Sequence, residues 1–278
     1  MITEAKDLTK GEYQLIAALV YEKSGINLGD QKMQLVRTRL NKRLREGNFR
    51  TFREYYQFVK EDESGRELTA LIDAISTNTT HLFRENKHFE FLAERFDEWL
   101  SPEARRREPI RIWSAGCSSG EEPYSIAITA REALERNRRG QVKILATDIS
   151  TRVLAKAQEG VFDAERLATV PKSYRRKYFQ RKGPRDAERF EIVPAVRELI
   201  TFARFNLMTP QFPFRNPFDV IFCRNVMIYF DKPTQEGLVR RYAHALRPGG
   251  YLLIGHSESL NSISHELAYV APTIYRKP

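Results

Sequence analysis

Hydrophobic residues recur at helical spacing over the first third of the chain. In residues 13–20 the apolar side chains fall on one helical face, and Gly25 follows as a residue that favours the end of a helix. Asp30 is an acceptable N-cap for the next helix. The spacing predicts a first helix that ends at Gly25 and further helices over residues 30–47, 49–59 and 67–75. We therefore expect an all-helical module over about residues 9–99.

The pattern changes from residue 110 onward, where short apolar runs alternate with amphipathic segments. The predicted strands cover residues 110–113, 142–147, 199–203, 218–222 and 251–254. The predicted helices cover residues 122–135, 151–158 and 234–246. Continuous apolar strands that alternate with helices indicate an α/β fold, in which a parallel sheet is covered by helices on both faces. The ligands of such sheets bind at the carboxyl ends of the strands.

A third pattern interrupts this alternation between residues 160 and 207. Three short segments could form antiparallel strands, over residues 177–181, 188–193 and 198–202, and the charged stretch 181–186 is a turn between the first two. We expect a small antiparallel β subdomain at about residues 160–205. The expected division of the chain is then a helical domain with its linker over residues 1–95 and an α/β domain over residues 96–278.

Composition narrows the class of protein. Lys and Arg total 46 against 36 Asp and Glu, a net charge of +10, which favours an anionic partner such as nucleic acid, a membrane surface or an acidic protein. Cys117 and Cys223 have no Cys or His near them at metal-ligand spacing, so we expect neither a disulfide framework nor a structural zinc site. The chain has neither an apolar run long enough to span a bilayer nor a secretory signal at its start, which predicts a cytoplasmic protein.

The segment after the first predicted strand carries small and acidic residues, Trp-Ser-Ala-Gly-Cys-Ser-Ser-Gly-Glu-Glu-Pro-Tyr over residues 113–124. It holds Gly116 and Gly120 but lacks the G-x-G-x-x-G pattern of dinucleotide-binding turns. Glu121 and Glu122 open the next helix, where they would repel a pyrophosphate but suit a ligand with a positive centre. An ordinary glycine turn with glutamates at a helix N-terminus is the alternative interpretation.

Polar residues also end the other predicted strands. Asp148 can accept hydrogen bonds from both hydroxyls of a ribose, or it can cap the next helix, for which Ser150 is better placed. Later strands are followed by Asn206-Leu207 and by Cys223-Arg224-Asn225. Together these strand ends favour a nucleoside or an amino acid as ligand. The Arg-Pro-Gly-Gly turn at 247–250 is typical of S-adenosylmethionine-dependent methyltransferases, whose sulfonium needs neither a phosphate cradle nor a metal.

Four segments in order, residues 76–85, 112–127, 218–231 and 255–259, resemble the chemotaxis receptor glutamate methyltransferases, the CheR family. The resemblance covers nearly the whole chain. It implies a Rossmann-like methyltransferase sheet, with residues 1–95 as the receptor-recognition domain and residues 96–278 as the catalytic domain. It also implies S-adenosylmethionine as cofactor, with no metal, and a glutamate carboxylate as the methyl acceptor.

The resemblance implies roles for individual residues. Arg84 and Tyr229 are expected at the reacting methyl group. Glu121 is expected at the methionine part of the cofactor, with Glu122 as the alternative. The remaining residues expected at the cofactor are Asn78, Thr80, Asp148 at the ribose, Asn206 and Leu207 at the adenine, Cys223, Arg224 and Asn225. The basic stripe of the second helix, with Arg39, Lys42 and Arg43, is expected to dock on acidic receptor helices, although charged helix faces are often only solvated.

The implied partner is the cytoplasmic helical bundle of methyl-accepting chemoreceptors, so that contact with the membrane is indirect and through the receptor. The protein itself is expected to be a monomer. Some members of this family bind the C-terminal peptide of the receptor through the β subdomain, but the charged, glycine-poor turn argues against that tethering here. A nucleic-acid methyltransferase is one alternative, but basic patches with interleaved aromatic residues are absent from the helical module. A non-catalytic receptor adaptor is another, and the intact set of expected site residues argues against it.

Overall fold

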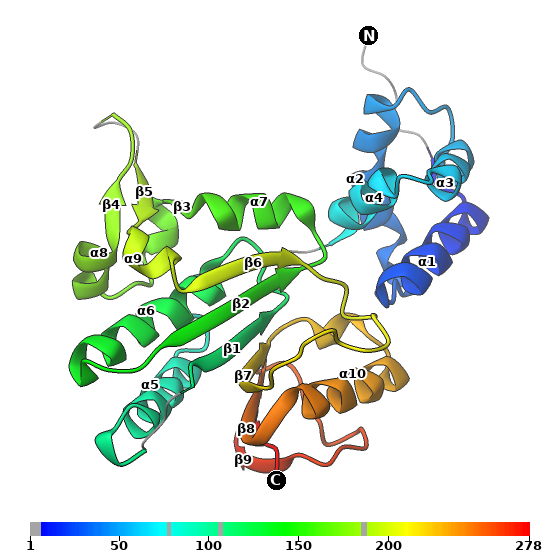
Figure 1. Ribbon diagram of the computed structural model, residues 1–278. Coiled ribbons are helices and arrows are strands. Elements are labelled where there is room, and N and C mark those ends of the chain that lie inside the picture. The colour runs from blue at the N-terminus through cyan, green and yellow to red at the C-terminus, as the bar shows by residue number, and fades with distance from the viewer. Residues whose placement is uncertain (1–6, 77–78, 105–107, 185–187) are drawn as a thin grey trace.

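The N-terminal helices form a separate helical domain in the computed structural model, which describes residues 7–76, 79–104, 108–184 and 188–278 (Figure 1). Its helices are α1 (Lys10–Ser24), η1 (Asp30–Lys32), α2 (Met33–Glu46), α3 (Phe52–Glu61) and α4 (Arg66–Ile75). Gly25 ends α1 with φ +72°, as predicted. The 3₁₀ turn η1 precedes α2, so the prediction that Asp30 is the N-cap of the second helix is wrong. Val36, Leu40 and Leu44 of α2 are fully buried in the core of this domain.

The second domain is built on a seven-stranded sheet with the strand order β6-β2-β1-β7-β8-β10-β9. The strands are β1 (Ile110–Ala115), β2 (Val142–Asp148), β6 (Ile200–Arg204), β7 (Phe218–Cys223), β8 (Leu246–Ile254), β9 (Ala268–Ala271) and β10 (Ile274–Arg276). The strands from β6 to β8 are parallel, whereas β10 pairs antiparallel with both β8 and β9. The parallel sheet was predicted, and the antiparallel edge was not.

Helices cover both faces of the sheet. Successive residues of a strand point to opposite faces, and both sets are apolar here, so each face needs a layer of helices to bury it. Ile112 of β1 belongs to the core under α5 (Lys87–Trp99) and α6 (Glu121–Asn137). Its neighbour Trp113 points the opposite way, into the core beneath α10 (Lys232–Ala245). Leu154 of α7 (Thr151–Glu159) packs beside Ala146 of β2. The prediction of helices on both faces is thus confirmed.

A small antiparallel sheet follows α7, with the strand order β3-β5-β4 (Figure 1). Its strands are β3 (Val161–Asp163), β4 (Phe179–Arg181) and β5 (Arg189–Ile192), and the short helices around it are η3 (Ala164–Leu167), α8 (Lys172–Tyr178) and α9 (Pro194–Arg197). The expected subdomain therefore exists. The assignment of residues 198–202 to it is wrong, because Ile200–Arg204 pairs in parallel with β2 and forms the edge of the large sheet.

The start of β8 differs from the sequence pattern. Strand β8 begins at Leu246 and includes the Pro-Gly-Gly stretch predicted as a turn, with a shift of register opposite residues 218–220. A domain division after residue 95 would fall inside α5, whose Phe89, Leu92 and Phe96 pack in the same core as Ile110. Since α5 contributes to the core of the large sheet, we propose that the boundary lies between α4 and Leu82.

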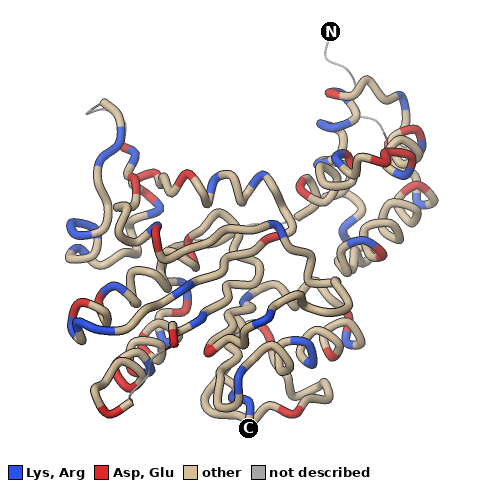
Figure 2. The backbone as a smooth tube through the Cα atoms, in the orientation of Figure 1, with Lys and Arg blue, Asp and Glu red and all other residues tan. Residues whose placement is uncertain are grey.

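The helical domain lies at the carboxyl edge of the parallel strands and is fixed there by polar contacts (Figure 1). The hydroxyl of Tyr21 donates to Asp231 at 2.7 Å, and the Asn206 amide donates to the carbonyl of Lys23 at 2.7 Å. Basic and acidic residues are interspersed in both domains (Figure 2). In the described part of the chain, no helix is long and apolar enough to cross a membrane.

Candidate active site

A cavity of about 220 Å³ lies where the carboxyl ends of the parallel strands meet the helical domain. Parallel sheets place their ligands at this edge, because the loops that leave the strands converge there. The helical domain supplies one wall through Ile26, Leu28 and Lys32. The cavity brings together most of the side chains expected at the cofactor or the methyl group, namely Thr80, Arg84, Asp148, Asn206, Leu207, Arg224, Asn225 and Tyr229.

The loop between β1 and α6 forms the floor of the cavity. The backbone N–H groups of Gly116 and Cys117 both donate to the carbonyl of Thr147 at 2.8 Å, which holds the loop against β2. Gly116 has φ +91°, and a Cβ there would lie 2.5 Å from Val226. A side chain at this position would therefore push apart two loops that both line the cavity.

Asp148 ends β2 beside this loop. Its Oδ2 accepts the backbone N–H of Ser118 at 2.9 Å, and its Oδ1 accepts that of Ser150 at 2.9 Å. Burial raises the pKa of this carboxyl in spite of the two N–H donors. Ser150 caps α7 by accepting from Val153, so Asp148 is not needed as the cap. Each oxygen keeps a second lone pair, which a ligand hydroxyl can use.

The two glutamates that open α6 differ in their surroundings. Glu121 is fully buried and forms an ion pair with Arg166, and it also accepts a hydrogen bond from Ser119 at 2.7 Å. It is not among the residues that line the cavity, whereas Glu122 is. The cavity lining favours Glu122, the expected alternative, over Glu121, and we propose Glu122 as the cofactor glutamate. The two side chains diverge because adjacent helical residues point about 100° apart.

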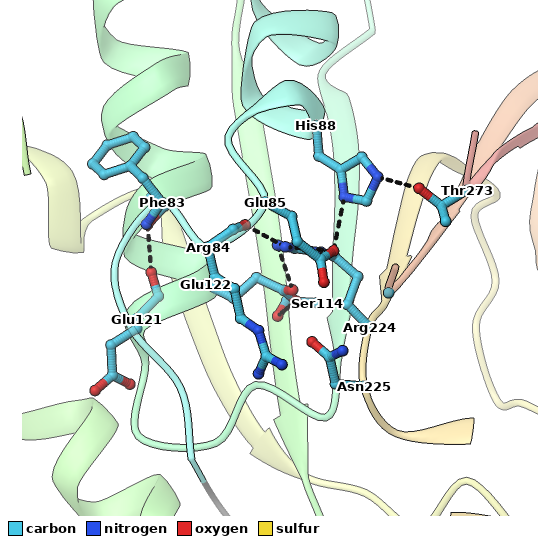
Figure 3. Close-up of polar contacts among 12 residues, drawn as sticks. Phe83, Arg84, Glu85, His88, Ser114, Glu121, Glu122, Arg224, Asn225 and Thr273 are labelled. Atoms are coloured by element: carbon cyan, nitrogen blue, oxygen red, sulfur yellow. Dashed lines mark hydrogen bonds and ion pairs between the residues drawn. The ribbon is translucent and has the colours of Figure 1, made fainter. Parts of the chain in front are cut away.

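Arg224 joins three segments behind the cavity (Figure 3). Its guanidinium pairs with Glu85 at 2.9 Å and with Glu122 at 3.2 Å, and it also donates to the carbonyl of Arg84. Burial raises the pKa of Glu122 although Arg224 opposes that shift. Burial also acts to raise the pKa of Glu85, but Arg224 and hydrogen bonds lower it overall. A buried arginine between two carboxylates fixes the backbone of Arg84 at the cavity wall.

The loop after β7 carries Asn225 and Tyr229, and Glu258 holds it in place. Oxygens of Glu258 accept the N–H groups of Asn225 at 3.0 Å, Val226 at 2.9 Å and Gly255 at 2.6 Å. A Cβ on Gly255 would lie 2.5 Å from the amide of Asn225, so only glycine fits here. The segment 255–259, one of the four that carry the family resemblance, therefore holds the loop after β7 in place through Glu258.

The two residues expected at the methyl group lie on the same cavity. Arg84 donates to the carbonyl of Thr79 at 3.2 Å, and its side chain is shown beside Asn225 in Figure 3. Lys32 of the helical domain lies over the ring of Tyr229, 5.6 Å from its centroid. Nothing in the sequence placed Lys32 at this cavity, since the contact joins residues that are far apart along the chain.

Other expected site residues lie elsewhere or have other contacts. Cys223 is fully buried in the core beneath α10 and does not line the cavity, because the last residue of a strand can point into the core. Asn206 lines the cavity, but its amide donates to Lys23 and its oxygen accepts from Met208. Asn78 lies outside the described residues.

The basic stripe on α2 is only partly free to meet a partner. Arg43 forms a bidentate pair with Glu67, in which Nε donates to Oε1 at 3.1 Å and Nη2 donates to Oε2 at 2.7 Å. Arg39 donates to the carbonyls of Ile75 and Ser76 at the end of α4. The Lys42 side chain is 79% exposed and lies 3.8 Å from Glu46. Two of the three expected docking residues therefore hold the helical domain together.

The parallel sheet, covered by helices on both faces and with a cavity at its carboxyl edge, places the protein in the Rossmann-like class. Residues 78–275 match the model described as CheR methyltransferase, SAM binding domain, and residues 11–76 match CheR methyltransferase, all-alpha domain. The chain belongs to the CheR methyltransferase family.

Named relatives match over almost their whole length. The chain is 42% identical to the chemotaxis protein methyltransferase of Borreliella burgdorferi, over 98% of this chain and 95% of that protein. It is 40% identical to chemotaxis protein methyltransferase 2 of Pseudomonas aeruginosa, over 96% and 93% of the two chains. It is 39% identical to the Salmonella typhimurium chemotaxis protein methyltransferase, over 99% and 92%.

The residues of the cavity fit S-adenosylmethionine. Asp148 is a buried carboxylate with lone pairs for ribose hydroxyls, and Glu122 is a carboxylate suited to a positive group. The apolar side chains of Ile26, Leu28 and Leu207 supply the surface that a purine needs. S-adenosylmethionine carries no phosphate, so its site needs no cluster of basic residues of the kind that binds a pyrophosphate.

Proposed function

We propose that this protein transfers a methyl group from S-adenosylmethionine to glutamate side chains on the cytoplasmic helical bundle of chemoreceptors, forming methyl esters. The proposal depends most on one observation: Arg84 and Tyr229 line the same cavity as Glu122 and Asp148. Arg84, which attracts a carboxylate, thus shares a cavity with Glu122 and Asp148, which suit a sulfonium nucleoside. The names of the relatives support chemotaxis proteins as the setting.

The cofactor, when bound, supplies a methyl group on a positively charged sulfur. We assign Asp148 to the ribose hydroxyls, Glu122 to the amino group of the methionine part, and Leu207 with Asn206 to the adenine. Thr80, Arg224 and Asn225 complete the walls of the cavity. Because Arg224 is paired with both Glu85 and Glu122, its role is to hold Glu122 in place rather than to bind the cofactor directly.

A receptor glutamate is already ionised at pH 7, so the methyl acceptor needs no general base. Arg84 orients the incoming carboxylate through its guanidinium, and the Tyr229 hydroxyl donates a second hydrogen bond. An arginine that bound the acceptor too tightly would stabilise the ground state, so its contribution is mainly geometric. The chain accelerates the reaction by positioning the carboxylate and by excluding water from the cavity.

The receptor docks on the helical domain, which carries the exposed Lys42 and places Lys32 at the cavity. Acidic helices of the receptor suit these lysines. We propose that the protein works as a monomer in the cytoplasm and reaches the membrane only through the receptor. The proposal gives the small sheet β3-β5-β4 no part in binding the C-terminal peptide of the receptor.

Transfer of a labelled methyl group to receptor-rich membranes tests the proposal. We expect label in the receptor that is released as methanol by mild base, since carboxyl esters hydrolyse under these conditions. Label that enters added RNA or DNA instead would identify a nucleic-acid methyltransferase. Calorimetry with S-adenosylhomocysteine completes the test, because an adaptor that has lost the cofactor site would neither bind this ligand nor transfer label.

A further inference from the structure

Three potential metal ligands meet behind the cavity wall. Glu85 precedes α5, His88 lies in the first turn of α5, and His256 follows β8. One donor atom from each of these side chains lies within 4.8 Å of the others. The rings of His88 and His256 have their centroids 5.5 Å apart. The group contains no cysteine and joins residues that are far apart along the chain.

The contacts of His88 favour one of its two neutral tautomers. Its Nε2 lies 2.8 Å from the hydroxyl oxygen of Thr273 (Figure 3). That hydroxyl donates its own hydrogen to the carbonyl of Pro272 at 2.6 Å. When the Thr273 hydroxyl donates in this way, its oxygen accepts from His88 Nε2, and a lone pair is left on His88 Nδ1.

This lone pair is buried and faces a carboxylate. His88 is 1% exposed, and among the described residues its Nδ1 has no hydrogen-bond partner. The Oε2 atom of Glu85, which is also an acceptor, lies 3.6 Å from it. Two acceptors that face each other in a buried place, with no donor between them, destabilise the folded protein. A cation between them would remove that destabilisation.

We propose that Glu85, His88 and His256 form a binding site for a divalent transition-metal ion of the zinc class. Two imidazoles and one carboxylate suit Zn²⁺ better than Mg²⁺ or Ca²⁺, which prefer oxygen ligands. In a tetrahedral zinc site with bonds of about 2.0–2.1 Å, neighbouring donor atoms lie about 3.4 Å apart. The 3.6 Å between His88 Nδ1 and Glu85 Oε2 is close to that separation. His256 is exposed and leaves a path for the ion.

The surrounding groups orient these ligands as outer-shell partners do in known metal sites. Thr273 accepts from the ring nitrogen of His88 that does not face the site. Glu85 accepts the backbone N–H of His256 at 3.1 Å and the guanidinium of Arg224 at 2.9 Å. Glu122, on the other side of Arg224, supplies a second negative charge near the guanidinium. A bound ion would fix Glu85 and, through Arg224, the wall that carries Arg84.

Calorimetry with zinc chloride tests the site directly, on chelator-treated protein without a histidine tag. We expect one equivalent of Zn²⁺ to bind, and His256→Ala to weaken that binding at least about tenfold. His244→Ala is the matched control, because His244 is also exposed and lies on α10 away from the cluster. Equal zinc affinity in wild type, His256→Ala and His244→Ala would overturn the proposal, as would the absence of binding.

Nitrogen NMR of the His88 ring gives a second measurement that needs no substitution in the core. Without zinc, we expect the proton on Nε2. Zinc should shift the Nδ1 signal as the metal bond forms. A proton on Nδ1, or a His88 spectrum that zinc leaves unchanged, would contradict the proposal. Both measurements are independent of methyl transfer, so their failure leaves the proposed function standing.

Discussion

Arg224 at the end of β7 and Glu122 in the first turn of α6 form an ion pair with a distance of 3.2 Å between Nη1 and Oε2. The pair is almost fully inaccessible to solvent, with side chains 2% and 13% exposed. It fixes which of two adjacent glutamates belongs to the cavity. Because the second oxygen of Glu122 accepts from Ser114 at 2.6 Å, the carboxylate has one defined orientation.

Glu122→Gln should weaken the binding of S-adenosylhomocysteine about tenfold, the effect of losing one charged hydrogen bond. Glu121→Gln is the matched control, since it makes the same change one residue earlier, where the side chain pairs with Arg166. Isothermal titration of both variants with S-adenosylhomocysteine shows which of the two glutamates binds the ligand. A loss of affinity in Glu121→Gln alone would restore the assignment expected from the sequence.

The affinity for S-adenosylhomocysteine should fall as the pH is lowered from about 8 to about 5. Burial raises the pKa values of Asp148 and Glu122 above the ordinary value of about 4, and the ligand needs their charged forms. Binding then releases protons, and calorimetry in buffers with different ionisation enthalpies measures that release. Asp148→Asn should both weaken binding and flatten the profile. An affinity that is constant over this range would rule out a titrating carboxylate at the ligand.

The stability of the ligand-free protein should respond to pH in the opposite direction through Asp148. An acid whose pKa is raised by folding binds its proton more tightly in the folded state, so its contribution to the unfolding free energy falls as the pH rises through the raised pKa. The difference between wild type and Asp148→Asn isolates this contribution from that of other groups. Denaturant unfolding at several pH values measures it. A difference that grows in favour of wild type at high pH would show the pKa to be lowered instead.

Lys42→Glu should impair receptor methylation without changing the melting temperature, because Lys42 is 79% exposed. Arg43→Glu should lower the unfolding free energy by about 2 kcal/mol, since it removes a bidentate pair with Glu67 and leaves two carboxylates together. Circular dichroism melts and methylation assays separate the two effects. Full receptor methylation by Lys42→Glu would show that this part of α2 does not meet the receptor.

Tyr229→Phe should lower kcat about tenfold while the affinity for S-adenosylhomocysteine stays unchanged. The substitution removes only a hydroxyl and keeps the ring on which Lys32 lies. Tyr21→Phe is the control, because it removes a hydroxyl that serves a contact with Asp231 at the domain interface. Methyl-transfer kinetics give kcat and KM separately. An unchanged kcat in Tyr229→Phe would exclude its hydroxyl from the reaction.

The sequence by itself determined the parts that depend on local pattern. Gly25 ends α1, the apolar runs form the parallel strands, and Asp148 ends β2. These features depend on residues that are close together in the sequence, so the local pattern predicts them. Resemblance over long segments indicated the family and several of the residues that line the cavity. The antiparallel strands β9 and β10 were not predicted, because strands of four and three residues have little pattern of their own.

Only the tertiary structure decided which groups meet. It placed Glu122 at the cavity beside Arg224 and directed Glu121 to Arg166, since adjacent residues of a helix point in different directions. It paired Arg43 with Glu67, and it brought His256 to His88. Such contacts join residues that are far apart along the chain, and their geometry follows from the packing of whole elements, which local sequence pattern does not encode.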